Sequence, residues 1–421
     1  MTDDVALAAV EIFVALLAAA VVVALVTRRL PVPYTVGLVL LGLVVGLVRS
    51  GAGIEISPAI VLSVLLPGLI FEAAFRIDLA NLRPSLLVVL FLAVPGVLIV
   101  ALVVAIVLQS TIGLAFGSAF IVGAMVAATD PAAVIATFKR LNAPERLATA
   151  VEAESLLNDG TGIVLFAIAV AATTGSTSIG EGFVRFVVVV VGSAILGSVA
   201  GWVASQLLRI SGDHLVELTI SLVLAYGAYL LADALGGSGI IATTAAGLTL
   251  GGYGRRHGLS ARAAESIDLV WEFIAFLSTA LIFLLIGLAI DVHVLLTDLV
   301  PIAWAILAIL VARAIVVYLL LGGASRIARR TGRVTVERGW LHVVFWAGLR
   351  GAVSVALVLS LPIDLPDRSL IAAIVYGVVL FTLIVQGSTA DWVVRRALAP
   401  GSGPGSGGGS TSGAVPIDEV E

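Results

Sequence analysis

Polar groups that could bind cations or protons lie inside stretches of the chain that are otherwise apolar. The stretch AESLLNDG contains Glu154, Asn158 and Asp159, and the preceding apolar stretch contains ATDP, with Thr129 and Asp130 before a proline. Small hard cations prefer oxygen ligands, and carboxylates also carry protons. These residue types could therefore hold either a cation or a proton at one site.

The spacing in AESLLNDG divides its polar residues between two adjacent faces of a helix. Residues four apart share a face, so Ser155 lies with Asp159, and Glu154 lies with Asn158. Asp159 falls near the middle of its apolar segment, where a charged Asp costs about 2.5–3.5 kcal/mol on insertion scales. So costly a residue indicates either a function or a partner.

Two arginines lie within apolar segments and require counter-ions. Arg350, in GLRGAV, is halfway through its segment, and a buried guanidinium without a counter-ion is prohibitively costly. We predict that Arg350 pairs with Glu154 and holds two helices together. We predict a second pair between Arg313 and Glu272.

If Glu154 is neutralised, Asp130 and Asp159 have no fixed cation. Two carboxylates that face each other in a low dielectric raise each other's proton affinity. Hydroxyls and freed backbone carbonyls nearby would complete a set of oxygen ligands. Glu72, in LLPGLIFEAAF, is either a carboxylate at the entrance or one that reaches the interface from a helix end.

The elements that position these residues must be membrane helices. The chain has 421 residues, 60% of them hydrophobic and only 12% charged, and a mean hydropathy of +1.19. This composition predicts an all-α polytopic membrane protein with no nucleic-acid partner. The absence of cysteine excludes disulfides, thiol catalysis and Cys-ligated metals, and no cofactor is expected.

Charged, Gly-rich and Pro-rich breaks divide the chain into thirteen apolar segments, most of them near the roughly 20 residues that a helix needs to cross a bilayer. The segments are 5–26, 33–49, 58–75, 84–108, 113–137, 147–172, 183–207, 214–233, 238–253, 266–290, 299–323, 339–361 and 369–394. We expect residues 1–400 to form one transmembrane unit and residues 401–421 to form a flexible Gly/Ser-rich tail.

The distribution of basic residues predicts the orientation. Eighteen of the 23 Lys and Arg residues fall in alternate loops, which places the N-terminus outside and the C-terminus in the cytoplasm. An odd number of helices allows two inverted six-helix repeats, helices 1–6 and 8–13. In helix 5, Pro131 removes a backbone N–H and predicts an opening at residues 128–131.

Three motifs, ATDPAAV, EAESLLNDGTG and GLRGAVSVAL, occur in an order that resembles sodium/proton antiporters. The resemblance is to the NhaP and sodium/hydrogen-exchanger branch of the cation/proton antiporter superfamily, and it extends over nearly the whole chain. It implies a dimerisation domain and a moving core domain that are interleaved in sequence, with helices 3–6 and 10–13 in the core. It also implies that helices 5 and 12 unwind where they cross, and that the protein forms homodimers.

The same resemblance implies roles for individual residues. Asp159 would be the principal ion- and proton-binding carboxylate, and Glu154 with Arg350 a structural pair. Asn158 before Asp159 matches the type linked to electroneutral exchange. Besides Asp159, the residues expected at the cation and proton site are Asp130, Thr129, Ser155, Asn158 and Glu72.

The expected function is a secondary antiporter of the cell membrane that exchanges Na⁺ or Li⁺ for H⁺ in pH homeostasis. K⁺ as the cation is the alternative within the same family. An intramembrane aspartyl protease is a remote alternative, because Asp130 and Asp159 are two acids on neighbouring helices. ATDP and LLND differ, however, from the Gly-x-Gly-Asp context of such proteases.

Overall fold

A computed structural model gives the fold of the chain and describes residues 2–29, 33–48, 58–173, 175, 179–323, 325 and 338–398. Every regular element among these residues is helical. The α-helices are α1 (Thr2–Thr27), α2 (Tyr34–Val48), α3 (Pro58–Ile60), α4 (Leu66–Arg76), α5 (Leu79–Leu82), α6 (Leu86–Phe91), α7 (Val97–Ile112), α8 (Phe116–Ala127), α9 (Ala132–Leu141), α10 (Glu145–Thr173), α11 (Ile179–Ser211), α12 (His214–Ala234), α13 (Gly239–Thr249), α14 (Arg255–His257), α15 (Ala261–Ala289), α16 (Val292–Thr297), α17 (Leu299–Ala314), α19 (Arg338–Trp346), α20 (Ala352–Leu359), α21 (Arg368–Phe381) and α22 (Gly387–Leu398). Tighter or wider helical turns continue some of them, at Val61–Leu65, Arg83–Ser85, Leu92–Gly96, Leu250–Gly254, Ile315–Leu321 and Thr382–Gln386.

The thirteen predicted segments each coincide with one helix or with consecutive helices, which confirms the all-α membrane fold. Within the described residues, nine helical stretches are long and apolar enough to cross a membrane. The twelfth segment is not among the nine because it is divided into α19 and α20, of nine and eight residues. The predicted flexible tail, 401–421, lies outside the described residues.

Polar residues at the breaks between segments begin several helices. The Asp213 side chain accepts the backbone N–H of Leu215 (2.8 Å) at the start of α12. At the start of α15, the Ser260 hydroxyl accepts the N–H of Ala263 (3.2 Å). Such caps satisfy N–H groups that have no partner within the helix, so the breaks in hydropathy are also physical helix starts.

Two spans are broken in the middle, and their breaks cross. The fifth span opens between α8 and α9, as Pro131 predicts, and the twelfth opens between α19 and α20. The backbone N–H of Asp130 in the first break donates to the carbonyl of Leu349 in the second (2.8 Å). The fifth and twelfth spans are each the fifth of a predicted six-helix half, which is the placement that the predicted inverted repeat requires.

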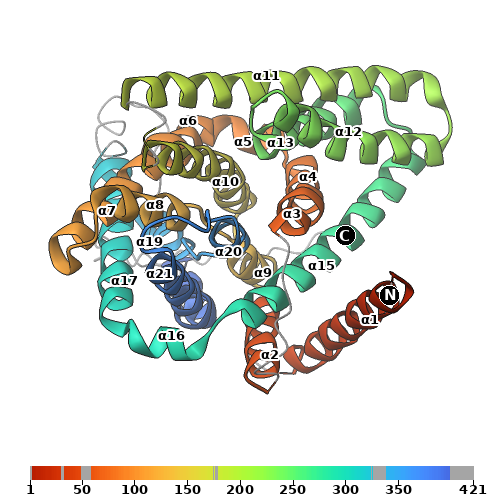
Figure 1. Ribbon diagram of the computed structural model, residues 1–421. Helices are drawn as coiled ribbons and strands as arrows, with labels where there is room; N and C mark the ends of the chain where they lie inside the picture. The colour runs from red at the N-terminus through yellow and green to blue at the C-terminus, as the bar shows by residue number, and fades with distance from the viewer. Residues whose placement is uncertain are drawn as a thin grey trace, which may run out of the picture.

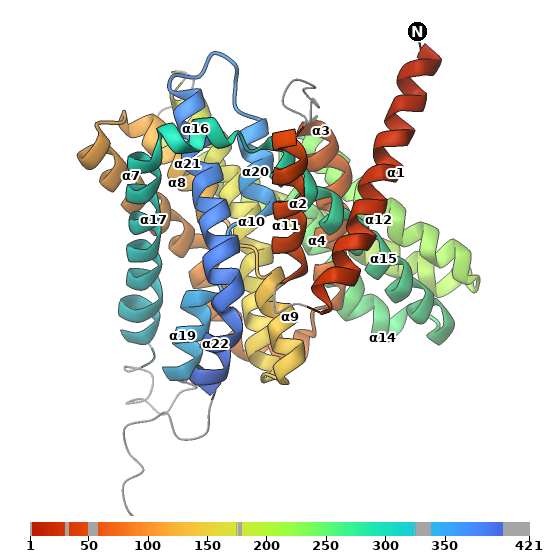
Figure 2. The ribbon, with the colours of Figure 1, turned by 90° about the horizontal axis from the view of Figure 1, so that it is seen from below.

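The broken helices lie near the centre of the bundle (Figure 1). Figure 2 shows α10, α20 and α21 running along the molecule, with α16 at one end and α9 and α22 at the other. A large apolar core surrounds the breaks, and a second buried cluster lies among α4, α11, α12, α13 and α15. Apolar side chains of α11 are exposed outward, among them Phe183 and Val188, as expected for a lipid-facing helix.

Candidate functional site

A cavity of about 230 Å³ lies beside the crossing of the two breaks; we call it the ion cavity. Its wall is formed by α4, the α8–α9 break, α9, α10, α15 and the start of α20. Five predicted site residues line it together, from three separate spans: Glu72, Thr129, Asp130, Ser155 and Asp159. The structure thus brings together most of the residues that were selected from the sequence.

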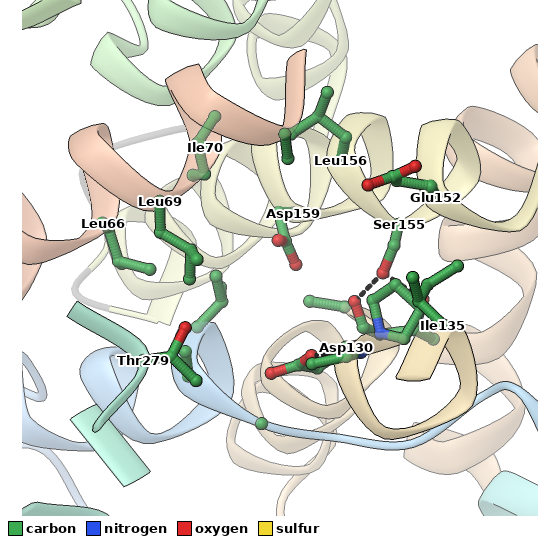
Figure 3. A pocket seen from close by; sticks show the side chains of 18 of the residues that line it. Leu66, Leu69, Ile70, Asp130, Ile135, Glu152, Ser155, Leu156, Asp159 and Thr279 are labelled. Atoms are coloured by element: carbon green, nitrogen blue, oxygen red, sulfur yellow. Dashed lines mark hydrogen bonds between the residues drawn. The ribbon is translucent and has the colours of Figure 1, made fainter. Parts of the chain in front are cut away.

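Asp159 and Asp130 both lie at this cavity but differ in their partners (Figure 3). The Asp130 carboxylate accepts the backbone N–H of Ala132 (3.0 Å) at the start of α9 and that of Ala352 at the start of α20. Asp159 is partly exposed to the cavity and makes no hydrogen bond or ion pair with any described residue. Asp130 therefore joins the two broken spans, whereas Asp159 is the carboxylate that is free to take a new partner.

A hydrogen-bond network holds the break open from the side of α10. Asn158 accepts the backbone N–H of Thr129 (3.0 Å) and donates its amide N–H to the Thr129 hydroxyl (2.6 Å). Ser155 Oγ donates to the Thr129 carbonyl and lies 3.1 Å from the Thr129 hydroxyl. In an unbroken helix the N–H of Thr129 would reach the carbonyl of Met125, which instead accepts from Ser354 (2.8 Å).

The sequence predicts Asn158 at the cation and proton site, but this network holds it away from the ion cavity. Asn158 is 1% exposed and does not line the ion cavity. Its amide replaces the partners that Thr129 loses at the break, because buried backbone groups require partners. Asn158 therefore acts on the site by holding Thr129 rather than by facing the cavity.

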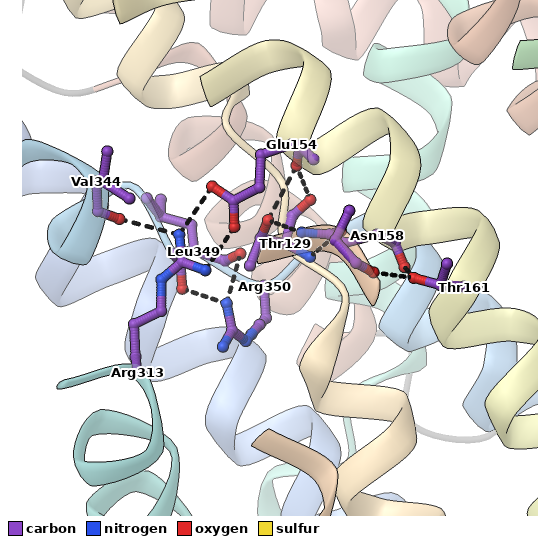
Figure 4. Close-up of polar contacts among 11 residues, drawn as sticks. Thr129, Glu154, Asn158, Thr161, Arg313, Val344, Leu349 and Arg350 are labelled. Atoms are coloured by element: carbon purple, nitrogen blue, oxygen red, sulfur yellow. Dashed lines mark hydrogen bonds and ion pairs between the residues drawn. The ribbon is translucent and has the colours of Figure 1, made fainter. Parts of the chain in front are cut away.

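The predicted pair of Glu154 with Arg350 is wrong, because Glu154 pairs with Arg313 of α17 (Figure 4). Arg313 Nη1 and Nη2 donate to the two carboxylate oxygens at 2.5 and 3.0 Å, and Nη2 also donates to the carbonyl of Val344 (3.0 Å). Glu154 and Arg313 are 2% and 6% exposed. This is a buried, bidentate ion pair between α10 and α17.

Arg350 instead donates to backbone carbonyls of the segment that it interrupts. Its Nη1 lies 2.6 Å from the carbonyl oxygen of Gly348. The opening between α19 and α20 leaves carbonyls without helical donors, and a guanidinium with five N–H groups can satisfy them. A sequence displays carboxylates as possible counter-ions but not the carbonyls that a helix break frees, and for this reason it favours Glu154 as the partner of Arg350.

The predicted pair of Glu272 with Arg313 is also wrong. Glu272 pairs with Arg76, the last residue of α4, at 2.9 Å. Arg76 also pairs with Glu72 at 2.9 Å, one helical turn earlier. Arg76 thus connects α4 to α15 beside the ion cavity, whereas Arg313 pairs with Glu154 in the interior of the bundle.

The comparisons with known proteins agree with this architecture. Residues 14–396 match the transmembrane family described as sodium/hydrogen exchangers. The chain belongs to the sodium/hydrogen exchanger family. It is 39% identical over 367 residues to the Na⁺/H⁺ antiporter ApNhaP of Aphanothece halophytica, covering 87% of this chain and 70% of that protein.

Two further comparisons cover nearly the whole of the matched proteins. The Na⁺/H⁺ antiporter NhaH of Halobacillus dabanensis is 34% identical over 395 residues, which is 90% of this chain and 96% of NhaH. The solved structure of the sodium proton antiporter MjNhaP1 of Methanocaldococcus jannaschii matches with a TM-score of 0.77 at 21% identity, over 93% of this chain and 99% of that one. The family resemblance read from the motifs is confirmed. Because the family and the relatives are transporters, the protease alternative is rejected.

Three charged residues of the exchanger's ion cavity are not among the site residues predicted from the sequence: Arg76, Lys139 and Glu152. Glu152 lies on α10 seven residues before Asp159, so the two share a face about 10 Å apart along the helix axis. Lys139, the only lysine of the chain, lines the same cavity from α9. The i, i+7 spacing of the two carboxylates was a signal that could have identified Glu152.

Glu152 makes no hydrogen bond or ion pair with the described residues, so in its ionised form its carboxylate can attract cations into the cavity that it lines. Unit charges about 10 Å apart at an effective dielectric of about 40 attract by about 0.8 kcal/mol, or about fourfold. We expect Glu152→Gln to raise the KM for the transported cation about fourfold and to leave kcat nearly unchanged. Exchange in proteoliposomes measures both, with the exposed Glu265→Gln as the matched control. An unchanged KM would exclude Glu152 from cation capture.

Gly351 is the residue that allows the two breaks to approach. A Cβ at this position would lie 2.7 Å from the Cβ of Asp130 and closer still to its carboxylate. Overpacking of this kind typically costs about 1–3 kcal/mol. We expect Gly351→Ala to displace Asp130 and to lower kcat/KM by at least about tenfold. Gly323→Ala, which meets no atom within 4 Å, is the control. Wild-type kinetics in G351A would show that the contact with Asp130 is dispensable.

Proposed function

We propose that this exchanger moves Na⁺ or Li⁺ in one direction and H⁺ in the other, with both competing for Asp159 beside Asp130. The observation that carries the proposal is the free Asp159 carboxylate in a cavity at the crossing of two broken helices. Broken helices at membrane depth are tolerated where they line a cavity, and they place the ion site of many transporters. The relatives named above as Na⁺/H⁺ antiporters support the same assignment.

Oxygen atoms around Asp159 suit a small monovalent cation. The carboxylates of Asp130 and Asp159 and the hydroxyls of Thr129 and Ser155 lie at one cavity, and Glu72 and Glu152 extend its acidic lining. Hard cations bind such oxygens, and a proton neutralises the same carboxylate. One site can therefore hold either substrate, and alternating access then exchanges one for the other.

Basic helix ends support the proposed orientation, with the N-terminus outside and the C-terminus in the cytoplasm of a cell membrane. The ends of α9 and α22 carry Lys139, Arg140, Arg395 and Arg396, and Figure 2 places both ends opposite the start of α1. The ion cavity extends from Asp159 toward Lys139 and so toward this basic side. We assign the conformation as inward-facing on this basis.

The family relationship supports a two-domain mechanism in a homodimer, with helices 3–6 and 10–13 as the moving core. The exposed apolar face of α11 would belong to the dimerisation domain. Cross-linking of single cysteines placed on α11 in this cysteine-free chain tests the homodimer directly.

Electroneutral exchange is proposed because Asn158, which cannot ionise, precedes Asp159. One Na⁺ then leaves as one H⁺ enters, and the rate should not respond to membrane potential. Dye-monitored ΔpH changes in proteoliposomes, with the potential clamped at zero or at about −100 mV, check this. Rates that rise with the potential would reject an electroneutral cycle.

Repeating the assay with Na⁺, Li⁺ and K⁺ decides between the proposed cations and the K⁺ alternative.

A further inference from the structure

A second, larger cavity of about 760 Å³ lies at the basic end of the bundle; we call it the basic cavity. It is bounded by the end of α1, the start of α2, one face of α9, α15 and α22. Three arginines line it with one carboxylate, namely Arg28, Arg140, Arg395 and Asp391. The basic cavity shares no lining residue with the ion cavity.

The described residues neutralise only part of the positive charge of these arginines. Asp391 pairs with both Arg140 (2.6 Å) and Arg395 (3.3 Å), so one carboxylate serves two guanidiniums. Arg28 has no hydrogen bond to its side chain and no ion pair among the described residues. The lining therefore carries a formal excess of two positive charges, which suits an anion. Guanidinium groups bind phosphate particularly well, because their planar fork of donors matches its oxygens.

The rest of the cavity wall is apolar and aromatic. Tyr34 and Phe276 stack with ring centroids 5.7 Å apart, and Trp392 lies at the cavity with 63% of its surface exposed. Next to the cavity, Val21 and Leu25 of α1 are more than half exposed to the surroundings of the bundle. A basic pocket between membrane helices, with an aromatic side chain at the interface, has the chemistry of a headgroup site that continues into an acyl-chain surface.

The wall that separates the two cavities is α9, the helix that begins directly after Asp130 and Pro131. One face of α9 lines the ion cavity with Ala132, Ile135 and Lys139. The adjoining face lines the basic cavity with Ala133, Ala136, Thr137 and Arg140. A molecule in the basic cavity therefore contacts the helix whose first turn is held by the Asp130 carboxylate.

We infer that the basic cavity binds the headgroup of an anionic phospholipid and that the bound lipid restrains α9, slowing the exchange cycle. The phosphate contacts Arg28, Arg140 and Arg395, and the acyl chains lie along α1. The coupling part of this inference rests on the proposed antiport function, whereas lipid binding can be measured without transport. The restraint arises because α9 must move relative to α1 and α2 if the core moves against the rest of the molecule.

Lipid binding is tested on delipidated full-length protein by native mass spectrometry with phosphatidylglycerol, phosphatidylcholine or glycerol 3-phosphate. We expect the parent chain to retain phosphatidylglycerol selectively. A basic residue near an anionic headgroup contributes about fivefold in affinity, so Arg28→Gln/Arg395→Gln should bind phosphatidylglycerol about thirtyfold more weakly. The control Arg83→Gln/Arg209→Gln removes the same charge from exposed sites outside both cavities. Equal lipid retention by the two double variants would overturn the site, as would equal binding of glycerol 3-phosphate without acyl chains.

Coupling is tested by exchange in vesicles of phosphatidylcholine with and without phosphatidylglycerol. We expect phosphatidylglycerol to lower the turnover of the parent chain and of R83Q/R209Q several-fold, and to leave R28Q/R395Q unaffected. If all three proteins respond equally, the lipid acts through the general surface potential, and the restraint on α9 is wrong. If no protein exchanges ions at all, the proposed function fails while the binding result still stands.

Discussion

Exchanging Asp159 for asparagine should abolish cation-driven proton movement while the protein remains folded. Asp159 lines the ion cavity, whereas the adjacent Asn158 does not. Asp159 makes no hydrogen bond or ion pair with the described residues, so its substitution breaks no such interaction. Asparagine keeps the volume of the side chain and removes the charge that binds both substrates. We expect the D159N rate in proteoliposomes to fall to that of protein-free vesicles.

Asp364→Asn is the matched control, because Asp364 is an exposed carboxylate with no ion pair in the described part of the chain. It should exchange ions at the parent rate. Size-exclusion profiles and melting temperatures of both variants should match those of the parent chain. Residual exchange in D159N above the vesicle background would move the principal site elsewhere, with Asp130 as the first candidate.

Loss of the Glu154–Arg313 pair should strongly destabilise the protein. Both side chains are buried, and two hydrogen bonds join them. Removing one partner leaves a buried charge uncompensated, which typically costs about 3–5 kcal/mol. We expect Glu154→Gln and Arg313→Gln each to lower the free energy of unfolding by that amount in detergent.

Double-mutant cycles separate this pair from the one that the sequence suggested. The coupling energy of Glu154 with Arg313 should exceed that of Glu154 with Arg350, because Arg350 donates to backbone carbonyls. Denaturant titration of the single and double glutamine variants provides both values under one condition. A larger coupling with Arg350 would show that the pairing in the structure is not the one that stabilises the protein.

The fold could be predicted from the sequence because membrane helices are long apolar runs that end at charged or Pro/Gly-rich breaks. Pro131 located the break in the fifth span, since proline lacks the N–H that a continuous helix needs. The break in the twelfth span has no proline, and its two glycines and Arg350 did not by themselves predict its opening. There the family resemblance, rather than local chemistry, gave the expectation.

Five of the residues selected from the sequence line the ion cavity, but the sequence predicted the partners of the charged residues only in part. Helical periodicity places Ser155 and Asp159 on one face, and both line the ion cavity. Periodicity does not determine which helix lies opposite, so Glu154 was assigned to Arg350 when Arg313 was also available. A helix break frees backbone carbonyls that can accept hydrogen bonds, and a sequence does not show where they lie. Arg350 donates to such a carbonyl, that of Gly348.

Direct competition between cation and proton at Asp159 is the central claim, and the pH dependence of Na⁺ affinity tests it most directly. Initial exchange rates in proteoliposomes should be measured over a range of Na⁺ concentrations at each pH. If one carboxylate binds either substrate, the apparent KM for Na⁺ should rise about tenfold per pH unit once the site is mainly protonated, while the maximal rate changes little. A KM that stays constant as the pH falls, with only the maximal rate declining, would contradict competition at one site.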